Sequence, residues 1–175
     1  MTKYVFKPYN PIWPVLFMRE RERIIRQISV PCDIEHVGST AIFGLGGKGI
    51  IDIGVAATKK DIDKISQWLQ MDLGYIFRES GSTSERWFFR IDLPDIEEGI
   101  RRYHLHLTFP ESYEWETLVL FRDYLRSHPE DVAKYAQLKE SLVGVVKGDG
   151  VEYRTQKQPF FEEILCRARK ERNLD

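Results

Sequence analysis

The sequence has few cysteines, no excess of charge of either sign and no long apolar run. Its two cysteines, Cys32 and Cys166, stand alone, outside any CxxC or metal-ligand spacing. So little cysteine is typical of a reducing compartment and excludes a disulfide framework or a zinc-finger pattern. Lysine plus arginine number 26 and aspartate plus glutamate number 27. The chain therefore has no global field that would hold a nucleic acid or an anionic membrane, and any anion site must be local.

The chain also lacks membrane and targeting signals. No apolar run approaches the roughly 20 residues that span a bilayer, and the N-terminal segment MTKYVFKPYN has no apolar signal core. We therefore expect a cytoplasmic protein without a membrane partner. Since 42% of the 175 residues are hydrophobic, the chain can bury a substantial core, and a single domain over residues 1–175 is expected. The sequence leaves the oligomeric state open.

Apolar periodicity predicts an ordered series of helices and strands. Helices are expected over residues 10–31, 59–71, 113–127, 128–146 and 158–172, and strands over 32–37, 50–57, 75–79, 85–93 and 101–109. At least two strand pairs have connections too short for a parallel crossover, so the sheet should be mixed and largely antiparallel. The expected fold class is α+β, with helices flanking the sheet and a helical C-terminal part.

The segment from Ile34 to Val55, IEHVGSTAIFGLGGKGIIDIGV, carries most of the chemical information. A short strand runs into Gly38, Ser39 and Thr40, and a glycine-rich loop follows. Glycine lets backbone N–H groups approach an anion closely, and neighbouring hydroxyls can bond phosphate oxygens. This layout is typical of phosphate binding.

The strand after this loop carries one carboxylate, Asp52, on the face opposite Ile51 and Ile53. Because an unpartnered buried carboxylate is costly, Asp52 should have a partner. It can hold a metal that accompanies phosphate, or it can accept a hydrogen bond from a loop N–H. Lys48 can neutralise phosphate or pair with Asp52. The sequence leaves both choices open.

The strand expected over 101–109 carries a second polar stripe. Period two places His104, His106 and Thr108 on one face and Tyr103 and Leu105 on the other. Neutral imidazoles that converge on one point suit a transition metal, and protonated ones suit a phosphate. The alternative is an ordinary solvent-facing stripe.

Other candidates carry less weight. His36 is more typical of a hydrogen-bonded core residue than of a ligand, and His128 lies at a helix junction. Spacing alone selects none of five further basic residues as phosphate contacts: Arg86, Arg90, Lys147, Arg154 and Lys157.

These residues resemble the GrpB family of small, largely uncharacterised proteins. The family pattern IEH-GST, GL, a lysine and IDI stands here as Ile34–Thr40, Gly44-Leu45, Lys48 and Ile51–Ile53. His-Leu-His at 104–106, FRDYLRSHPEDVAKYAQLK at 121–139 and the Tyr153 to Lys157 region resemble its later blocks. The resemblance thus covers most of the chain.

The GrpB family is in turn similar to the nucleotidyltransferase superfamily, and this resemblance implies a nucleotidyltransferase-like fold. It implies nucleoside triphosphate contacts from Gly38, Ser39, Thr40 and Lys157, and catalytic roles for Asp52 and Lys48. It also implies a divalent metal, Mg or Mn with Zn as an alternative, at Asp52, His104 and His106. Some GrpB-like domains are joined to dephospho-coenzyme A kinases, which links the family by association to nucleotide or coenzyme A metabolism.

The chain departs from the superfamily pattern at one telling position. A second acid usually follows two residues after the first, and here that residue is Gly54. Two-metal transfer needs carboxylates that clamp both ions, so the expected centre has lost a ligand. The loop also carries Phe43 and Gly49 where the family tends to have prolines, which predicts less rigid positioning of phosphate.

Three hypotheses follow. The leading one is a nucleotidyltransferase-like enzyme with an unknown acceptor. The second is a non-catalytic nucleotide-binding or regulatory module that lost its acid at Gly54. The third, a paired His-x-Thr phosphoesterase, needs a partner for His106-Leu107-Thr108, and neither His36 nor His128 supplies one.

Overall fold

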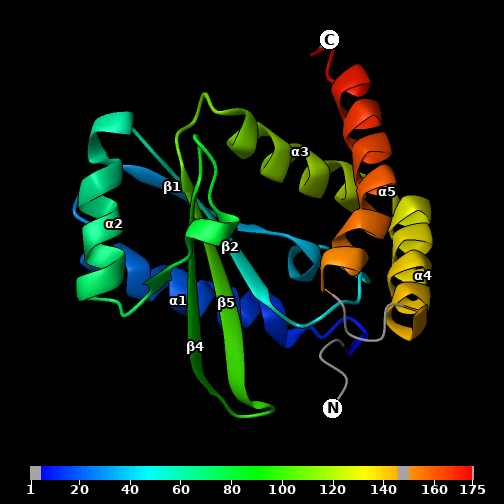
Figure 1. Cartoon of the computed structure of the whole chain (residues 1–175), viewed down its shortest axis with the longest axis horizontal. Helices are drawn as coiled ribbons and strands as arrows, with labels where there is room; N and C mark the ends of the chain where they lie inside the picture. Colours follow the sequence, from blue (N-terminus) through cyan, green and yellow to red (C-terminus); the bar gives the residue numbers. More distant parts are fainter. Residues whose placement is uncertain (1–4, 146–149, 175) are drawn as a thin grey trace.

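Five strands form one mixed sheet in the computed structural model, which describes residues 5–145 and 150–174 (Figure 1). The strands are β1 Cys32–Val37, β2 Ile51–Ala57, β3 Ile76–Phe77, β4 Trp87–Asp95 and β5 Gly99–Thr108. The helices are α1 Ile12–Gln27, α2 Ile62–Met71, α3 Tyr113–Ser127, α4 Pro129–Val145 and α5 Gly150–Glu171. Short 3-10 turns are η1 Ser39–Ala41, η2 Lys59–Asp61 and η3 Glu79–Gly81.

The strand order is β1-β2-β5-β4-β3, and only the pair β2 and β5 is parallel. The intervening chain makes the crossover that a parallel pair requires, and it contains α2, β3 and β4. The prediction of an α+β fold with a mixed, largely antiparallel sheet is confirmed. The parallel pair also sets the site, because it places Asp52 beside His104 and Gly54 beside His106.

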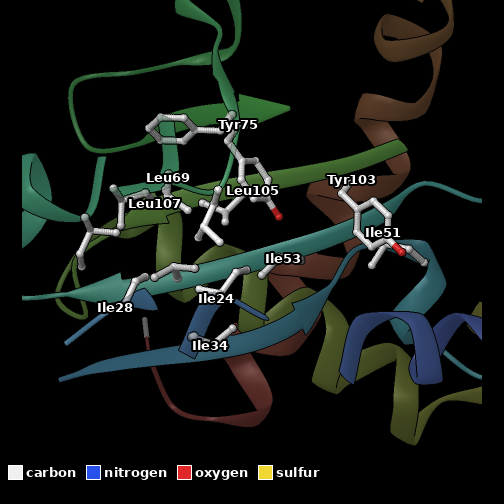
Figure 2. Close-up of a cluster of buried hydrophobic side chains, with 14 of the residues drawn as sticks. Ile24, Ile28, Ile34, Ile51, Ile53, Leu69, Tyr75, Tyr103, Leu105 and Leu107 are labelled. Atoms are coloured by element: carbon white, nitrogen blue, oxygen red, sulfur yellow. The ribbon is translucent and has the colours of Figure 1, made fainter. Parts of the chain in front are cut away.

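One face of the sheet is apolar and is covered by α1 and α2. Figure 2 shows the cluster, in which side chains from β2 and β5 meet those of both helices. Its members include Ile24, Ile51, Ile53, Leu69, Leu105 and Leu107, each at most 1% exposed. Burying one such side chain contributes about 1.5 to 3 kcal/mol, so this layer fixes the sheet on which the polar face is built.

Helices α3, α4 and α5 pack together on the other side of the sheet (Figure 1). They form a second apolar cluster, and this cluster includes Ile42 and Leu45 from the glycine loop, both fully buried. Ser112 caps α3, since its side chain accepts a hydrogen bond from the N–H of Trp115. Burial of the two loop residues attaches the glycine loop to the helical layer.

The structure differs from the prediction at several places, including the first helix, which ends at Gln27 rather than near residue 31, and the strand predicted over 75–79, of which only Ile76–Phe77 pairs in the sheet. Helix α5 begins at Gly150 rather than near residue 158 and contains Pro159, which we took to lie near a helix start. A proline inside a helix removes one backbone hydrogen bond, yet packing can outweigh that loss. Ile25, an apolar residue at helical spacing in the first predicted helix, is 43% exposed. Strands β4 and β5 run further toward their shared turn at Asp95–Gly99, where Asp95 Oδ1 accepts hydrogen bonds from the N–H groups of Glu97 and Glu98.

Two predicted features fall elsewhere. Val146, the expected end of the fourth helix, and Lys147, a candidate phosphate contact, lie outside the described residues. Across residues 5–145 and 150–174, none of the helices combines the length and apolar character needed to cross a bilayer.

Candidate functional site

A cavity of about 740 Å³ lies over the polar face of the sheet. Strands β2, β5 and β4 make its floor. The glycine loop, α4 and α5 line one side, and the segment 78–86 lines the other. Among the described residues that line it, eight are lysine or arginine and one, Asp52, is a carboxylate. Although the chain as a whole is nearly neutral, this cavity favours an anion.

Asp52 lies on the floor against two imidazoles. Its Oδ1 is 3.2 Å from Nδ1 of His104 and 3.6 Å from Nε2 of His106. Burial opposes ionisation of Asp52, but its close contacts with both histidines outweigh burial and hold the pKa of Asp52 below its usual range. Burial also lowers the pKa of His106. The structure therefore brings together Asp52, His104 and His106, the three residues predicted from the sequence as metal ligands.

This cluster is hydrogen-bonded rather than open. Both imidazoles face the same oxygen of Asp52, and the part of the chain that the structure describes contains no group of three or more His, Cys, Asp or Glu side chains arranged to hold a metal ion. Mg²⁺ commonly takes one or two carboxylates and completes its shell with substrate phosphates and water. A cation at Asp52 would need such phosphate oxygens.

Gly38 brings the serine turn against Asp52. Its φ is +70°, and a Cβ atom at this position would lie 2.4 Å from Oδ2 of Asp52. The chain then turns through η1, where Ser39 Oγ accepts a hydrogen bond of 3.0 Å from Nζ of Lys139. The serine turn and the lone aspartate thus face one cavity.

Gly38→Ala should destabilise the protein by about 2 to 4 kcal/mol, because the new methyl group meets the Asp52 carboxylate and φ is positive. Gly44→Ala is the matched control, since Gly44 has φ +77° with no atom within 4 Å of its Cβ position. Gly44→Ala should lower the free energy of unfolding by only about 1 kcal/mol, from backbone strain. Urea unfolding followed by circular dichroism measures both, and equal losses would refute the close packing.

Thr40, predicted as a phosphate contact, has its hydroxyl engaged in the fold. It is 1% exposed, and its Oγ1 donates to the carbonyl of Ile50 at 3.0 Å. A hydroxyl has one proton, so Nε2 of His36, also 3.0 Å away, is the donor to Thr40. His36 is buried and stacks on Phe17, and burial lowers its pKa to about 4. Thr40 can therefore offer phosphate only its backbone N–H, and His36 is the core residue that we expected.

Lys139 is a site residue that sequence reasoning missed. Although only 2% of it is exposed, its Nζ lies in the cavity lining and donates to Ser39 and to the carbonyl of Gly46. Burial, with repulsion from Lys157, lowers the pKa of Lys139 to about 7. Lys139 thus joins α4 to both ends of the glycine loop and places a titrating amine at the serine turn.

A signal for Lys139 was present in the sequence. Val132, Tyr135 and Leu142 form the buried stripe of α4, and Lys139 occupies the same stripe at helical spacing. A lysine at a position that the periodicity assigns to an apolar side chain is costly to bury. Such a lysine is a candidate functional residue.

Lys48 and Lys157 converge on one aromatic ring. Their Nζ atoms lie 4.6 Å and 5.2 Å from the ring centre of Tyr153 on α5. Burial, together with repulsion from Lys157 and Arg154, lowers the pKa of Lys48 to about 8, and burial lowers the pKa of Lys157. The predicted residues Lys48 and Lys157 therefore share one wall of the cavity with Lys139.

Arginines lie on the floor of the cavity, on β4 and β5, and on its opposite side, in the segment 78–86. Arg86 pairs with Glu114 at 2.6 Å, and both Arg90 and Arg102 pair with Asp92, at 2.6 Å and 2.9 Å. Neither acid belongs to the cavity lining, whereas these arginines do. The acids therefore hold the guanidinium groups from outside the cavity.

Gly54, at the position of the missing second acid, is covered by Trp115 of α3. A Cβ atom on Gly54 would lie 3.0 Å from the indole of Trp115 and 3.5 Å from Val37. The side chain of an aspartate would have to displace the indole. The packing of α3 on β2 therefore leaves little room for an acidic side chain at position 54.

Thr108 does not serve a phosphoesterase site. It is fully buried, its Oγ1 lies 2.6 Å from that of Ser112, and it donates to the carbonyl of Glu85. Thr108 supports the start of α3, and the polar stripe of β5 enters the cavity only at Arg102, His104 and His106.

Comparison with known proteins identifies a family and several relatives that this chain resembles. A family model described as GrpB protein matches residues 3–167. A UPF0157 protein of Pseudomonas aeruginosa is 36% identical over 163 residues, which are 92% of this chain and 66% of that protein. A dephospho-CoA kinase of Mycobacterium bovis is 25% identical over 189 residues, which cover 92% of this chain and 45% of the kinase.

A solved structure shares the whole architecture. The crystal structure of conserved protein GrpB from Enterococcus faecalis superimposes with a TM-score of 0.81 at 26% identity, covering 95% of this chain and 98% of that one. The cavity described above therefore belongs to a fold already observed by experiment.

Proposed function

This chain belongs to the GrpB family, and we propose that its cavity binds a nucleoside triphosphate or a related polyphosphorylated small molecule. The observation that carries the proposal is the lysine wall. Lys139 is buried with its Nζ on Ser39, half-buried Lys48 and Lys157 lie against the ring of Tyr153 in the same cavity, and each of the three has a lowered pKa. Burial and mutual repulsion disfavour the charged forms of these amines, and a bound anion would stabilise them.

The cavity has the size and polarity that such a ligand needs. Small-molecule sites usually enclose about 300 to 1,000 Å³, and this one has about 740 Å³. Ser39 Oγ and the amides of a glycine-rich turn supply short-range hydrogen bonds, and the lysines supply charge. A ligand with one phosphate would use only part of this wall, so a chain of phosphates fits it best.

We propose further that the protein transfers a nucleotidyl group, in a nucleotidyltransferase-like arrangement. Asp52 would hold a divalent ion together with phosphate oxygens, and that ion would neutralise charge that develops on the transferred group. The imidazole nitrogens of His104 and His106 suit Mn or Zn better than Mg. Lys48 would assist electrostatically. The kinship with part of a dephospho-CoA kinase points to nucleotide or coenzyme A metabolism.

A second candidate is a nucleotide-binding module without turnover. The specific observation in its favour is Trp115, which fills the place of the second acid at Gly54. Only an enzyme releases pyrophosphate. Mixing the protein with ATP, Mg or Mn and a panel of acceptors, and then measuring pyrophosphate, therefore separates the two candidates.

Nucleotide affinity should fall as the pH rises from about 6.5 to 9. Lys139 and Lys48 have pKa values of about 7 and about 8 without ligand. A bound phosphate chain stabilises their charged forms and raises these pKa values, so binding takes up protons in this window and is tighter at low pH. Calorimetric titration of ATP with Mg, in buffers of different ionisation enthalpy, measures both the nucleotide affinity and the number of protons taken up on binding. Wild-type protein that binds no nucleotide at any of these pH values would refute the proposal.

A further inference from the structure

We propose that the arginine side of the cavity binds the acceptor, and that this acceptor is a small molecule with a terminal phosphate or carboxylate group. Arg90 and Arg102 are the residues assigned to hold that oxyanion. The inference rests on the proposed function and names the class of acceptor that it leaves open.

Asp52 and Arg90 lie on β2 and β4, the two strands that flank β5 in the sheet. In the sheet, Asp52 of β2 is in register with His104 of β5, and His104 is in register with Arg90 of β4. Strands are about 4.8 Å apart, so Arg90 lies about 10 Å from Asp52 across the floor. Arg102 precedes His104 by two residues and shares its face. The lysines come instead from α4 (Lys139), α5 (Lys157) and the glycine loop (Lys48).

Asp92 organises these arginines without neutralising them. Its carboxylate accepts one hydrogen bond from Arg90, at 2.6 Å, and two from Arg102, at 2.9 and 3.2 Å. Hydrogen bonds from Arg102 and Arg90 outweigh desolvation and keep the pKa of Asp92 below its usual range. Two guanidinium groups on one ionised carboxylate leave a net positive charge. Each guanidinium has five N–H donors in a rigid fork, so donors remain for a second oxyanion.

Stability alone is a poor explanation for this cluster. The side chains of Arg90 and Arg102 are 34% and 43% exposed, and ion pairs exposed to this degree contribute little to folding stability. Both side chains line the same cavity as the lysine wall. A guanidinium group whose orientation is fixed by Asp92 is suited to orient an incoming phosphate or carboxylate.

An oxyanion acceptor also balances the chemistry. One of its oxygens would attack the α-phosphorus of the nucleotide and form a new P–O bond. The bond from that phosphorus to the bridging oxygen of the β-phosphate would break, and pyrophosphate would leave with the electron pair. The attacking oxygen carries no proton, so the step needs no general base. A phosphate acceptor yields a diphosphate bridge, and a carboxylate acceptor yields a mixed anhydride.

A two-ligand titration tests the inference. The protein is first saturated with a non-hydrolysable ATP analogue and Mg, and phosphomonoesters, carboxylates and neutral alcohols of similar size are then titrated by calorimetry. We expect binding from one oxyanion class and not from the alcohols. The Arg90→Gln, Arg102→Gln double variant should weaken this binding by about tenfold or more and leave analogue affinity within about threefold.

Arg26→Gln is the control, because Arg26 is an exposed arginine of α1 that pairs with Glu22. This control should change neither the affinity for the ATP analogue nor the affinity for the oxyanion. Thermal melting checks that each variant is folded. The inference is overturned if the analogue binds but no oxyanion follows it, if alcohols bind equally well, or if the double variant retains oxyanion binding. Failure of the analogue to bind wild-type protein would instead overturn the proposed function.

Discussion

Lys139→Met is expected to weaken nucleotide binding strongly and to raise the melting temperature of the free protein. Folding lowers the pKa of Lys139 from 10.5 to about 7, so between these values the unfolded chain binds more protons than the folded one. Stability from this group therefore rises with pH across that window, and at neutral pH the buried amine is destabilising. Methionine removes that penalty and fills the space. The lost hydrogen bonds to Ser39 and Gly46 offset part of the gain.

The net stabilisation should be about 1 to 3 kcal/mol, or several degrees in melting temperature. ATP affinity should fall by about a hundredfold or more, because Lys139 bonds the serine turn directly. Lys134→Met is the matched control on the same helix, since Lys134 is 60% exposed and pairs with Asp131. Lys134→Met should change neither the melting temperature nor the ATP affinity appreciably. A less stable Lys139→Met protein with normal ATP affinity would assign Lys139 a purely structural role.

Asp52→Asn is expected to eliminate pyrophosphate release and to preserve metal-free nucleotide binding. Asparagine keeps the shape that packs against Gly38 but removes the carboxylate that would hold a metal. Turnover should fall by about a thousandfold or more, the usual size of such an electrostatic loss. Metal-free ATP binding should be unchanged or tighter, because the negative charge beside the lysine wall is gone.

Asp33→Asn is the control for this prediction, since Asp33 is an exposed residue of β1. A fluorescent pyrophosphate assay and calorimetry without metal give the two readouts. Retention of turnover in Asp52→Asn would refute the role of Asp52. Wild-type protein that binds nucleotide and never releases pyrophosphate would favour the non-catalytic module.

The fold was predictable where local pattern and packing agree. The alternation in β2 and β5 placed Asp52, His104 and His106 on one side of their strands, and the sheet register then put them together. The start of α5 was not predictable, because Pro159 favours a helix start by local rules and tertiary packing against α3 and α4 decides otherwise.

The rest of the site depends on long-range packing, which periodicity cannot show. Lys139 reaches Ser39 across 100 residues of sequence, and Trp115 of α3 closes over Gly54 of β2. Thr40 looked equivalent to Ser39 in the sequence, yet its hydroxyl is engaged with His36 and Ile50. Each of these facts depends on which helix lies over which strand.

The most direct test of the account is a crystal structure of the wild-type protein with a non-hydrolysable ATP analogue and Mn²⁺. The account predicts phosphate oxygens within hydrogen-bond distance of Ser39 and Lys139. It also predicts anomalous scattering from Mn²⁺ within about 2.5 Å of an Asp52 carboxylate oxygen. Nucleotide bound away from the lysine wall, or Mn²⁺ bound away from Asp52, would contradict it.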